Sequence, residues 1–100
     1  MKSEAAYQSE LKKRIRQRWP KCIVLKQDSQ QLQGIPDLVL FFPEYSEKYA
    51  MLEVKQSQTA SHRPNQDYYV ELFNKCSFAA FVYPENEAAV LNEIDDWLKS

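Results

Sequence analysis

The sequence has few of the residues that hold together several common classes of small protein. It contains one histidine, His62, and two cysteines, Cys22 and Cys76, which lie far apart, so it offers no clustered ligands for structural zinc. We expect both cysteines to be buried, reduced thiols. No apolar run is long enough to cross a membrane, and residues 1–7 lack the apolar core of a signal peptide. We therefore expect a soluble, intracellular (cytoplasmic) protein.

The overall charge gives no reason to expect strong binding to nucleic acid, because the formal net charge is only −1. Positive charge is nevertheless concentrated in the first third of the chain. The basic residues of this segment are Lys12, Lys13, Arg14, Arg16, Arg18, Lys21 and Lys26. They could contact nucleic acid, or they could simply solvate a helix and the segment that follows it.

Size and apolar periodicity predict one domain over residues 1–100, because 100 residues that are 44% hydrophobic can form one modest core. A residue of the apolar set Tyr7, Leu11, Ile15 and Trp19 recurs at every fourth position, which predicts an amphipathic helix over 4–19. Further elements follow from β-branched runs and turn residues. They are strands over 22–26, 38–42, 49–55 and 78–83, a helix over 64–75, and a final helix after Asn86.

This order, αβββαβα, predicts an α/β fold with a small mixed β-sheet flanked by helices. The middle strands carry apolar residues on both faces, so we expect helices to cover the sheet on both sides except at one polar end. The inward-facing residues expected on the last two helices are Tyr69, Leu72 and Phe73, then Val90, Leu91, Ile94 and Leu98. Gly34, the only glycine, is expected to adopt a backbone angle that other residues rarely adopt.

The strands over 38–42 and 49–55 are expected to pair as an antiparallel hairpin with a turn over 43–48. If the hairpin is symmetric about Tyr45, opposed residues have numbers that sum to 90, and Asp37 lies across from Glu53. Opposed Cβ atoms are about 5 Å apart on one face, close enough for two carboxylates to bind one divalent cation. Lys55 lies on the same face, two residues beyond Glu53. A shift of one residue would destroy this arrangement.

Two carboxylates and a lysine at a strand end are suited to metal-dependent hydrolysis of a phosphodiester. Hard oxygen ligands select Mg²⁺ or Mn²⁺, and the backbone carbonyl of Val54 could add a ligand. Lys55 could orient the attacking water or offset charge in the transition state. The alternative is an exposed Glu53–Lys55 ion pair with no catalytic role.

The segment Pro36-Asp37 followed by Glu53-Val54-Lys55 resembles the signature of the PD-(D/E)XK nuclease superfamily. A finer pattern is similar to its VRR-NUC branch, over roughly residues 4–66. This pattern consists of Glu4, Gln8, Gly34-Ile35-Pro36-Asp37, Leu52-Glu53-Val54-Lys55 and Pro64-Asn65-Gln66. The resemblance implies a restriction-endonuclease-like core and a structure-specific DNA endonuclease that requires Mg²⁺ or Mn²⁺. Small phage-type members resemble Holliday-junction resolvases, which implies branched DNA as substrate and a homodimer.

The predicted site combines the residues of the motif with flanking side chains. Its catalytic residues are Asp37, Glu53, Lys55 and Gln66, its metal ligands are Asp37, Glu53, Val54 and Glu4, and its DNA contacts are Lys26, Arg63, Lys12, Lys13 and Arg16. Glu10 is an alternative to Glu4, although it could instead pair with a nearby basic residue. Gln66 could hold a phosphate or the attacking water, or serve as an ordinary helix cap. His62 and residues 27–33 flank the site and could also contact DNA.

Two other functions are compatible with these residues. A nuclease with a different DNA substrate would use the same residues. A module that binds DNA or a protein partner on a nuclease-like scaffold, without catalysis, would not need Asp37, Glu53 and Lys55 together.

Overall fold

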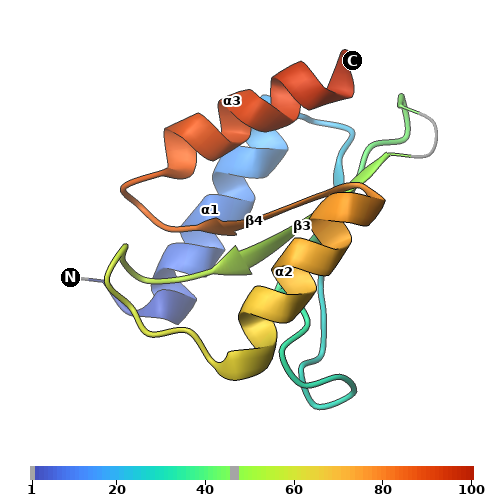
Figure 1. Cartoon of the computed structure of the whole chain (residues 1–100). Helices are drawn as coiled ribbons and strands as arrows, with labels where there is room; N and C mark the ends of the chain where they lie inside the picture. Colours follow the sequence, from blue (N-terminus) through green and yellow to red (C-terminus); the bar gives the residue numbers. More distant parts are fainter. Residues whose placement is uncertain (1, 46–47) are drawn as a thin grey trace.

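The computed structural model describes residues 2–45 and 48–100, and within them three helices and a four-stranded mixed sheet (Figure 1). The elements are α1 (Glu4–Arg18), β1 (Ile23–Lys26), β2 (Leu38–Phe41), β3 (Tyr49–Val54), α2 (Pro64–Cys76), β4 (Phe78–Val82) and α3 (Glu87–Leu98). The predicted α/β class and element order are confirmed. Each predicted boundary lies within one residue of the observed one, because turn residues and changes of periodicity mark these ends clearly.

The sheet has the strand order β1-β2-β3-β4. The pairs β1–β2 and β2–β3 are antiparallel, whereas β3 and β4 are parallel and are joined through α2. In the hairpin, Leu38 pairs with Leu52 and Phe41 with Tyr49, so the predicted register is confirmed. Ser46 and Glu47, which belong to the predicted turn, lie outside the described residues.

The main core lies between the sheet and helices α1 and α3, which cover one face (Figure 1). The Ser3 hydroxyl caps α1 by accepting a hydrogen bond from the Ala6 N–H at 3.1 Å. The apolar stripes of both helices are buried as predicted, apart from Trp19, which is half-buried. The buried stripe residues are Tyr7, Leu11, Ile15, Val90, Leu91, Ile94 and Leu98.

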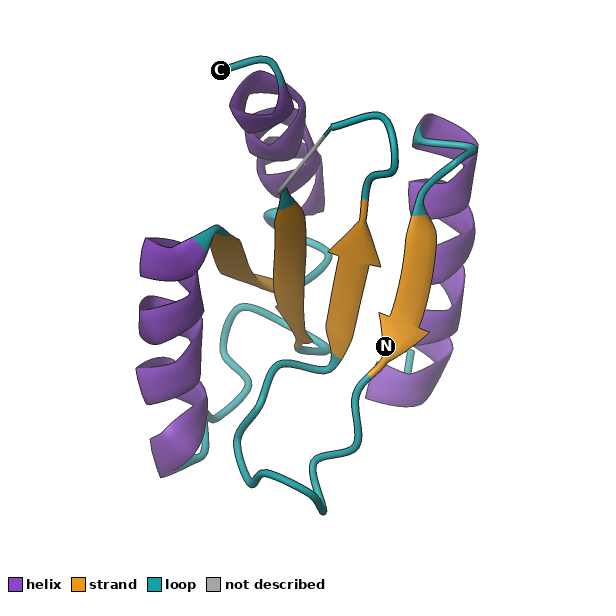
Figure 2. Cartoon of the chain, turned by 90° about the vertical axis from the view of Figure 1, so that its right-hand side faces the viewer, coloured by secondary structure: helices purple, strands orange, loops and turns teal. Residues whose placement is uncertain are grey.

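Helix α2 lies on the other face of the sheet and packs mainly over β3 and β4 (Figure 2). Val70 and Phe73 form its inward side and pack against a small cluster of Val39, Met51 and Ala79. The prediction that Leu72 points inward is wrong, because its side chain is 37% exposed. Successive helical residues are about 100° apart, so Leu72 points away from the side that carries Val70.

The expectation that helices cover both faces of the sheet is only half correct. Among the described residues, no helix lies in front of β1 and β2 on the side of α2 in Figure 2. Ile23, Leu25 and Phe41, which share this face by the β1–β2 register, are 49%, 50% and 41% exposed. We refer to these three residues as the open face. The fold leaves it open because the β3–α2–β4 crossover is confined to the other half of the sheet.

The two cysteines are free, but only Cys22 is partly buried, and burial raises the pKa of its thiol to about 11. The expectation of a buried Cys76 is wrong, since it ends α2 on an exposed side. Among the described residues, no helix has both the length and the apolar character that a membrane span requires.

Two truncations of leucine test the packing of the two faces. Leu52→Ala removes a fully buried side chain from the main core and should lower the free energy of unfolding by about 2–5 kcal/mol. Leu72→Ala, on the exposed side of α2, should change it by about 0.5 kcal/mol or less. Urea unfolding followed by circular dichroism measures both. Equal losses would contradict this description of α2.

Candidate active site

The predicted site residues surround a cleft at the end of the hairpin. The cleft has a volume of about 560 Å³. One wall is formed by residues 29–35, the other by residues 56–66, and the first residue of α1 reaches its rim. Of the predicted residues, the cleft brings together Glu4, Asp37, Glu53, Lys55, Arg63 and Gln66.

Asp37 is held at the cleft by backbone contacts on both sides. The buried Pro36 precedes it in the chain. The Asp37 carbonyl accepts a hydrogen bond from the Gln27 N–H at 2.8 Å, and Asp37 Oδ2 accepts one from the Val54 N–H at 2.8 Å. Extension of the β2–β3 register by one residue places Asp37 opposite Glu53, as predicted. The carboxylate is therefore fixed against the end of β3. Val54 contributes its N–H to this arrangement, and its carbonyl as a metal ligand stays a prediction.

Glu53 is a buried acid, with only 3% of its surface exposed. Its pKa is raised far above the usual range, first by burial, then by a hydrogen bond to Asp37 and by the charge of Asp37. Lys55 opposes this shift, and the charge of Glu4 adds to it. In the protein alone, the two carboxyl groups therefore disfavour simultaneous ionisation.

Lys55 is also buried, at 6% exposure, so the alternative of an exposed Glu53–Lys55 pair is wrong. Its Nζ donates to Gln66 Oε1 at 2.7 Å and to the Ser61 carbonyl at 3.1 Å. Gln66 Oε1 also accepts from the Arg63 N–H at 2.9 Å, at the start of α2. Gln66 thus caps its helix and holds the lysine at the same time, so the two roles considered for it are compatible.

The two acids of α1 lie in different surroundings. Glu4 lines the cleft, and its charge helps to raise the pKa of Glu53. Glu10 is instead paired with Lys2 Nζ at 2.6 Å. Across residues 2–45 and 48–100, however, no group of three or more His, Cys, Asp and Glu side chains is arranged to hold a metal ion. Glu4 as a third ligand therefore stays a prediction.

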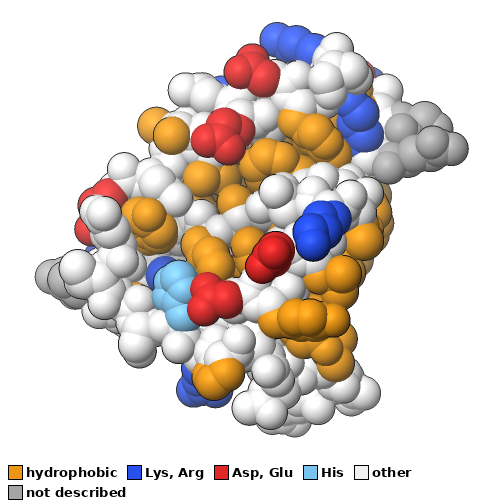
Figure 3. Space-filling model, viewed as in Figure 1, with side chains coloured by type: hydrophobic (Ala, Val, Ile, Leu, Met, Phe, Trp, Pro, Cys, Tyr) orange, Lys and Arg blue, Asp and Glu red, His pale blue; other side chains and the backbone are white. Residues whose placement is uncertain are grey.

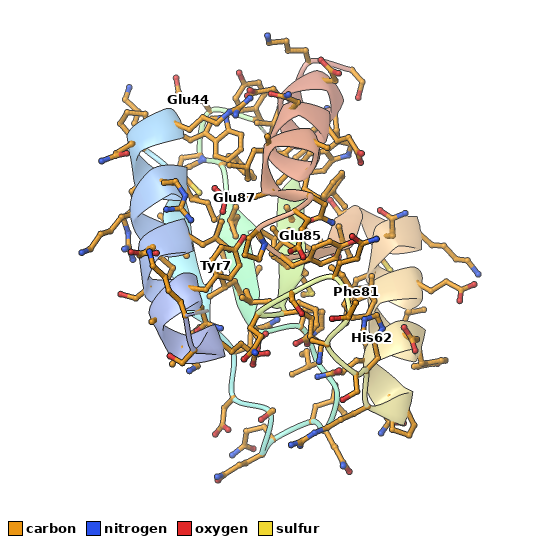
Figure 4. All side chains as sticks on the ribbon, turned by 90° about the vertical axis from the view of Figure 1, so that its left-hand side faces the viewer. Tyr7, Glu44, His62, Phe81, Glu85 and Glu87 are labelled. Atoms are coloured by element: carbon orange, nitrogen blue, oxygen red, sulfur yellow. The ribbon has the colours of Figure 1, made fainter. Side chains whose placement is uncertain are left out.

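The predicted DNA contacts are spread over the surface rather than gathered at the cleft. Only Arg63 lines it; Lys26 ends the edge strand β1, and Lys12, Lys13 and Arg16 lie further along α1. Two neighbouring arginines of α1 bind acids of α3 instead. Arg14 contacts Glu87, which also accepts from the Tyr7 hydroxyl at 2.8 Å (Figure 4), and Arg18 contacts Asp95.

Gly34 has the positive φ that was expected, +92°. The structure adds a second reason for glycine here, because a Cβ at this position would lie 2.3 Å from the Cβ of Asn65. Residues 29–35 thereby approach the first turn of α2 closely. The Asn65 amide also donates to the Gln33 carbonyl at 3.4 Å.

Sequence reasoning missed the backbone groups of the site, namely the Ser61 carbonyl and the Val54 N–H. Every residue has such groups, so the residue types give no signal for them. Only the register of the strands and the path of the 56–63 segment place them.

The order of the elements and the residues gathered at the cleft are compatible with a nuclease of the PD-(D/E)XK type. Comparison with known protein families matches residues 1–84 to the VRR-NUC domain, and the chain belongs to this family, a branch of those nucleases. The match includes the hairpin, α2 and β4, and ends before α3. No curated protein and no solved structure matches the chain significantly.

The raised pKa of Glu53 predicts how stability depends on pH in metal-free protein. Folded Glu53 keeps its proton at pH values where the unfolded chain has lost it, from about pH 4.3 upward. The native state then binds more protons, so Glu53 makes the free energy of unfolding fall as pH rises. Glu53→Gln should remove this contribution, and the stability of the variant relative to wild type should increase between about pH 5 and pH 8. Denaturant unfolding in chelator measures both curves, and parallel curves would contradict the shift.

Proposed function

We propose that the chain is a metal-dependent endonuclease that hydrolyses DNA phosphodiesters, with Asp37 and Glu53 as metal ligands. The observation that carries this proposal is the opposed pair of carboxyl groups beside the buried Lys55, in one cleft. Membership of a nuclease family supports it independently. A purely structural site would have little reason to keep two acids that raise each other's cost of ionisation.

The donor set fits Mg²⁺ or Mn²⁺. Mg²⁺ in phosphate chemistry is commonly held by one or two carboxylates, with waters and substrate oxygens as the other ligands, which suits Asp37 and Glu53. A divalent charge there would also favour the ionised form of Glu53. When bound, such an ion would polarise the phosphodiester and lower the pKa of a coordinated water.

Lys55 and Gln66 have roles that follow from their contacts. The Lys55 ammonium has three N–H donors, of which Gln66 and Ser61 take two. The third can donate to a phosphate oxygen in the cleft and offset the charge that develops there. Gln66 fixes the ammonium in place, so it needs no reorganisation during the reaction. Arg63, on the same rim, can bind a neighbouring phosphate.

We propose four-way junction DNA as the substrate, on the basis of the likeness to small junction resolvases. Resolution needs two symmetric cuts, and the cleft of one chain holds one opposed carboxyl pair. A homodimer would supply the second site. We propose that the second copy binds along the edge of β1, where Ile23 and Leu25 of the open face are about half exposed and would lie beside their counterparts in the second copy.

The edge of β1 gives this contact a specific geometry. The Gln27 N–H bonds to the Asp37 carbonyl, so in an antiparallel pair the backbone groups of Val24 and Lys26 point outward. A second β1 can pair there antiparallel about a two-fold axis. The two clefts would then lie on one face of a continuous sheet, about four strand spacings or roughly 20 Å apart across it.

Cleavage of labelled four-way junction, flap and linear duplex DNA in Mg²⁺ or Mn²⁺ tests the activity. Asp37→Asn and Lys55→Ala should each lower the rate at least about 100-fold, because each removes a group that contacts the reacting phosphate or its metal. Glu44→Gln, at the opposite end of the hairpin in Figure 4, and Lys75→Ala, on α2, are matched controls that should keep the wild-type rate.

Symmetric junction cuts support a resolvase, and cuts that ignore the junction keep the nuclease with a different substrate. Absence of metal-dependent cutting would overturn the proposed activity and favour a non-catalytic DNA-binding or partner-binding module.

Sedimentation velocity tests the dimer. Wild type should sediment at twice the chain mass of 11.8 kDa, and Leu25→Glu should sediment as a monomer because it places a charge in the apolar contact. Leu72→Glu, an equivalent change on the exposed side of α2, should remain dimeric. A monomeric wild type at the concentrations of the cleavage assay would rule out this assembly.

A further inference from the structure

His62 lies in the segment between β3 and α2 and stacks on Phe81 of β4 (Figure 4). The ring centroids are 4.0 Å apart and the planes differ by 14°. Its Nδ1 lies 2.9 Å from Asp67 Oδ1 on α2, and since a carboxylate only accepts, Nδ1 is the donor. Figure 3 shows this one histidine at the surface beside an acidic side chain. One side chain thus ties the segment to both β4 and α2.

The two residues next to His62 in the chain both contribute to the surroundings of Lys55. The Ser61 carbonyl accepts directly from Lys55 Nζ. The Arg63 N–H donates to Gln66 Oε1, the same oxygen that accepts from Lys55. A displacement of the backbone at His62 would therefore disturb both acceptors of the ammonium.

The stacking partner of His62, Phe81, lies beside a residue of the candidate site in the sheet. Phe81 pairs with Glu53 in the parallel β3–β4 register, so both side chains lie on the face of the sheet that α2 occupies. The ring of His62 is thus anchored one strand away from the carboxylate that neighbours Lys55. The side chain of His62 is 33% exposed, whereas that of its partner Asp67 is 65% exposed.

We propose that His62 is a positioning residue, whose contacts with Phe81 and Asp67 hold the 61–63 backbone so that Lys55 keeps its two acceptors. Among the described residues, no hydrogen bond, ion pair or ring contact joins His62 to Asp37 or Glu53, so we expect it to act through Lys55. A small misplacement of a catalytic group can lower a rate greatly, which gives this anchor a function beyond stability. The inference rests on the proposed role of Lys55.

The same segment has a second anchor that serves as a matched control. The Gln58 N–H donates to Glu85 Oε2 at 3.3 Å, at a point away from both acceptors of Lys55. Removal of the Glu85 carboxylate should loosen the first half of the segment and leave Lys55 in place. If general loosening of the segment were enough, Glu85→Ala would have the same effect on Lys55 as His62→Ala, so comparison of the two variants separates the cases.

Hydrogen exchange of the Lys55 ammonium, followed by NMR in protein with ¹⁵N-labelled lysine, tests the proposal without metal or DNA. His62→Ala should speed this exchange at least about tenfold, because the ammonium loses its fixed acceptors. His62→Phe, which keeps a ring on Phe81, should recover part of the protection, and Glu85→Ala should match wild type. Asp67→Ala changes an exposed carboxylate and should also speed the exchange. It replaces His62→Ala in the test if that variant does not fold. Unchanged exchange in folded His62→Ala or, in its place, Asp67→Ala would overturn the proposal.

Cleavage kinetics add a second measurement. His62→Ala should lower kcat about tenfold or more and change KM by a smaller factor, since Lys55 faces the reacting phosphate whereas Arg63, in the same segment, would contact only a neighbouring one. Equal changes in kcat for His62→Ala and Glu85→Ala would contradict a specific role for His62. If wild type does not cut DNA, the proposed function fails, while the exchange measurement still decides whether His62 positions Lys55.

Discussion

The pairing register of β2 and β3 is the constraint on which the rest of the site depends. Leu38 and Leu52 are opposed and fully buried, and a slip of β3 by one residue would turn Leu52 and the other core residues of β3 toward the other face. Any other register would expose core residues to water, so packing of the main core fixes the register. One residue further along, the same register places Asp37 opposite Glu53. Burial of apolar side chains thus holds the carboxyl groups of Asp37 and Glu53 opposite one another, with Glu53 itself buried.

The two faces of the sheet serve different purposes. Helices α1 and α3 cover one face and enclose the main core, and Arg14 and Arg18 form ion pairs with α3. In the described part of the chain, α2 alone covers the other face, over half of its width. The cleft lies on this less covered side, where the first turn of α2 provides Gln66 and leaves room for a substrate. Incomplete packing here is compatible with function, since a nucleic acid or a second copy needs access.

The sequence predicted the features that follow from chain-local rules. Periodicity and turn residues placed all the elements, and the position of Tyr45 set the register that brings Asp37 and Glu53 together. It could not predict features that depend on how the elements lie in space. The exposed side chain of Leu72 follows from the lateral position of α2, and the Lys55 acceptor at Ser61 is a backbone atom. The stacking of a lone histidine likewise has no local pattern.

Isothermal titration of Mn²⁺ into wild type, Asp37→Asn and Glu44→Gln at neutral pH tests the proposed metal site most directly. We expect one bound ion per chain in wild type, binding weakened at least about tenfold by Asp37→Asn, and wild-type binding for Glu44→Gln, since only the first change removes a ligand. No binding by wild type, or binding unchanged by Asp37→Asn, would contradict the claim that the opposed carboxylates form a metal-dependent nuclease site.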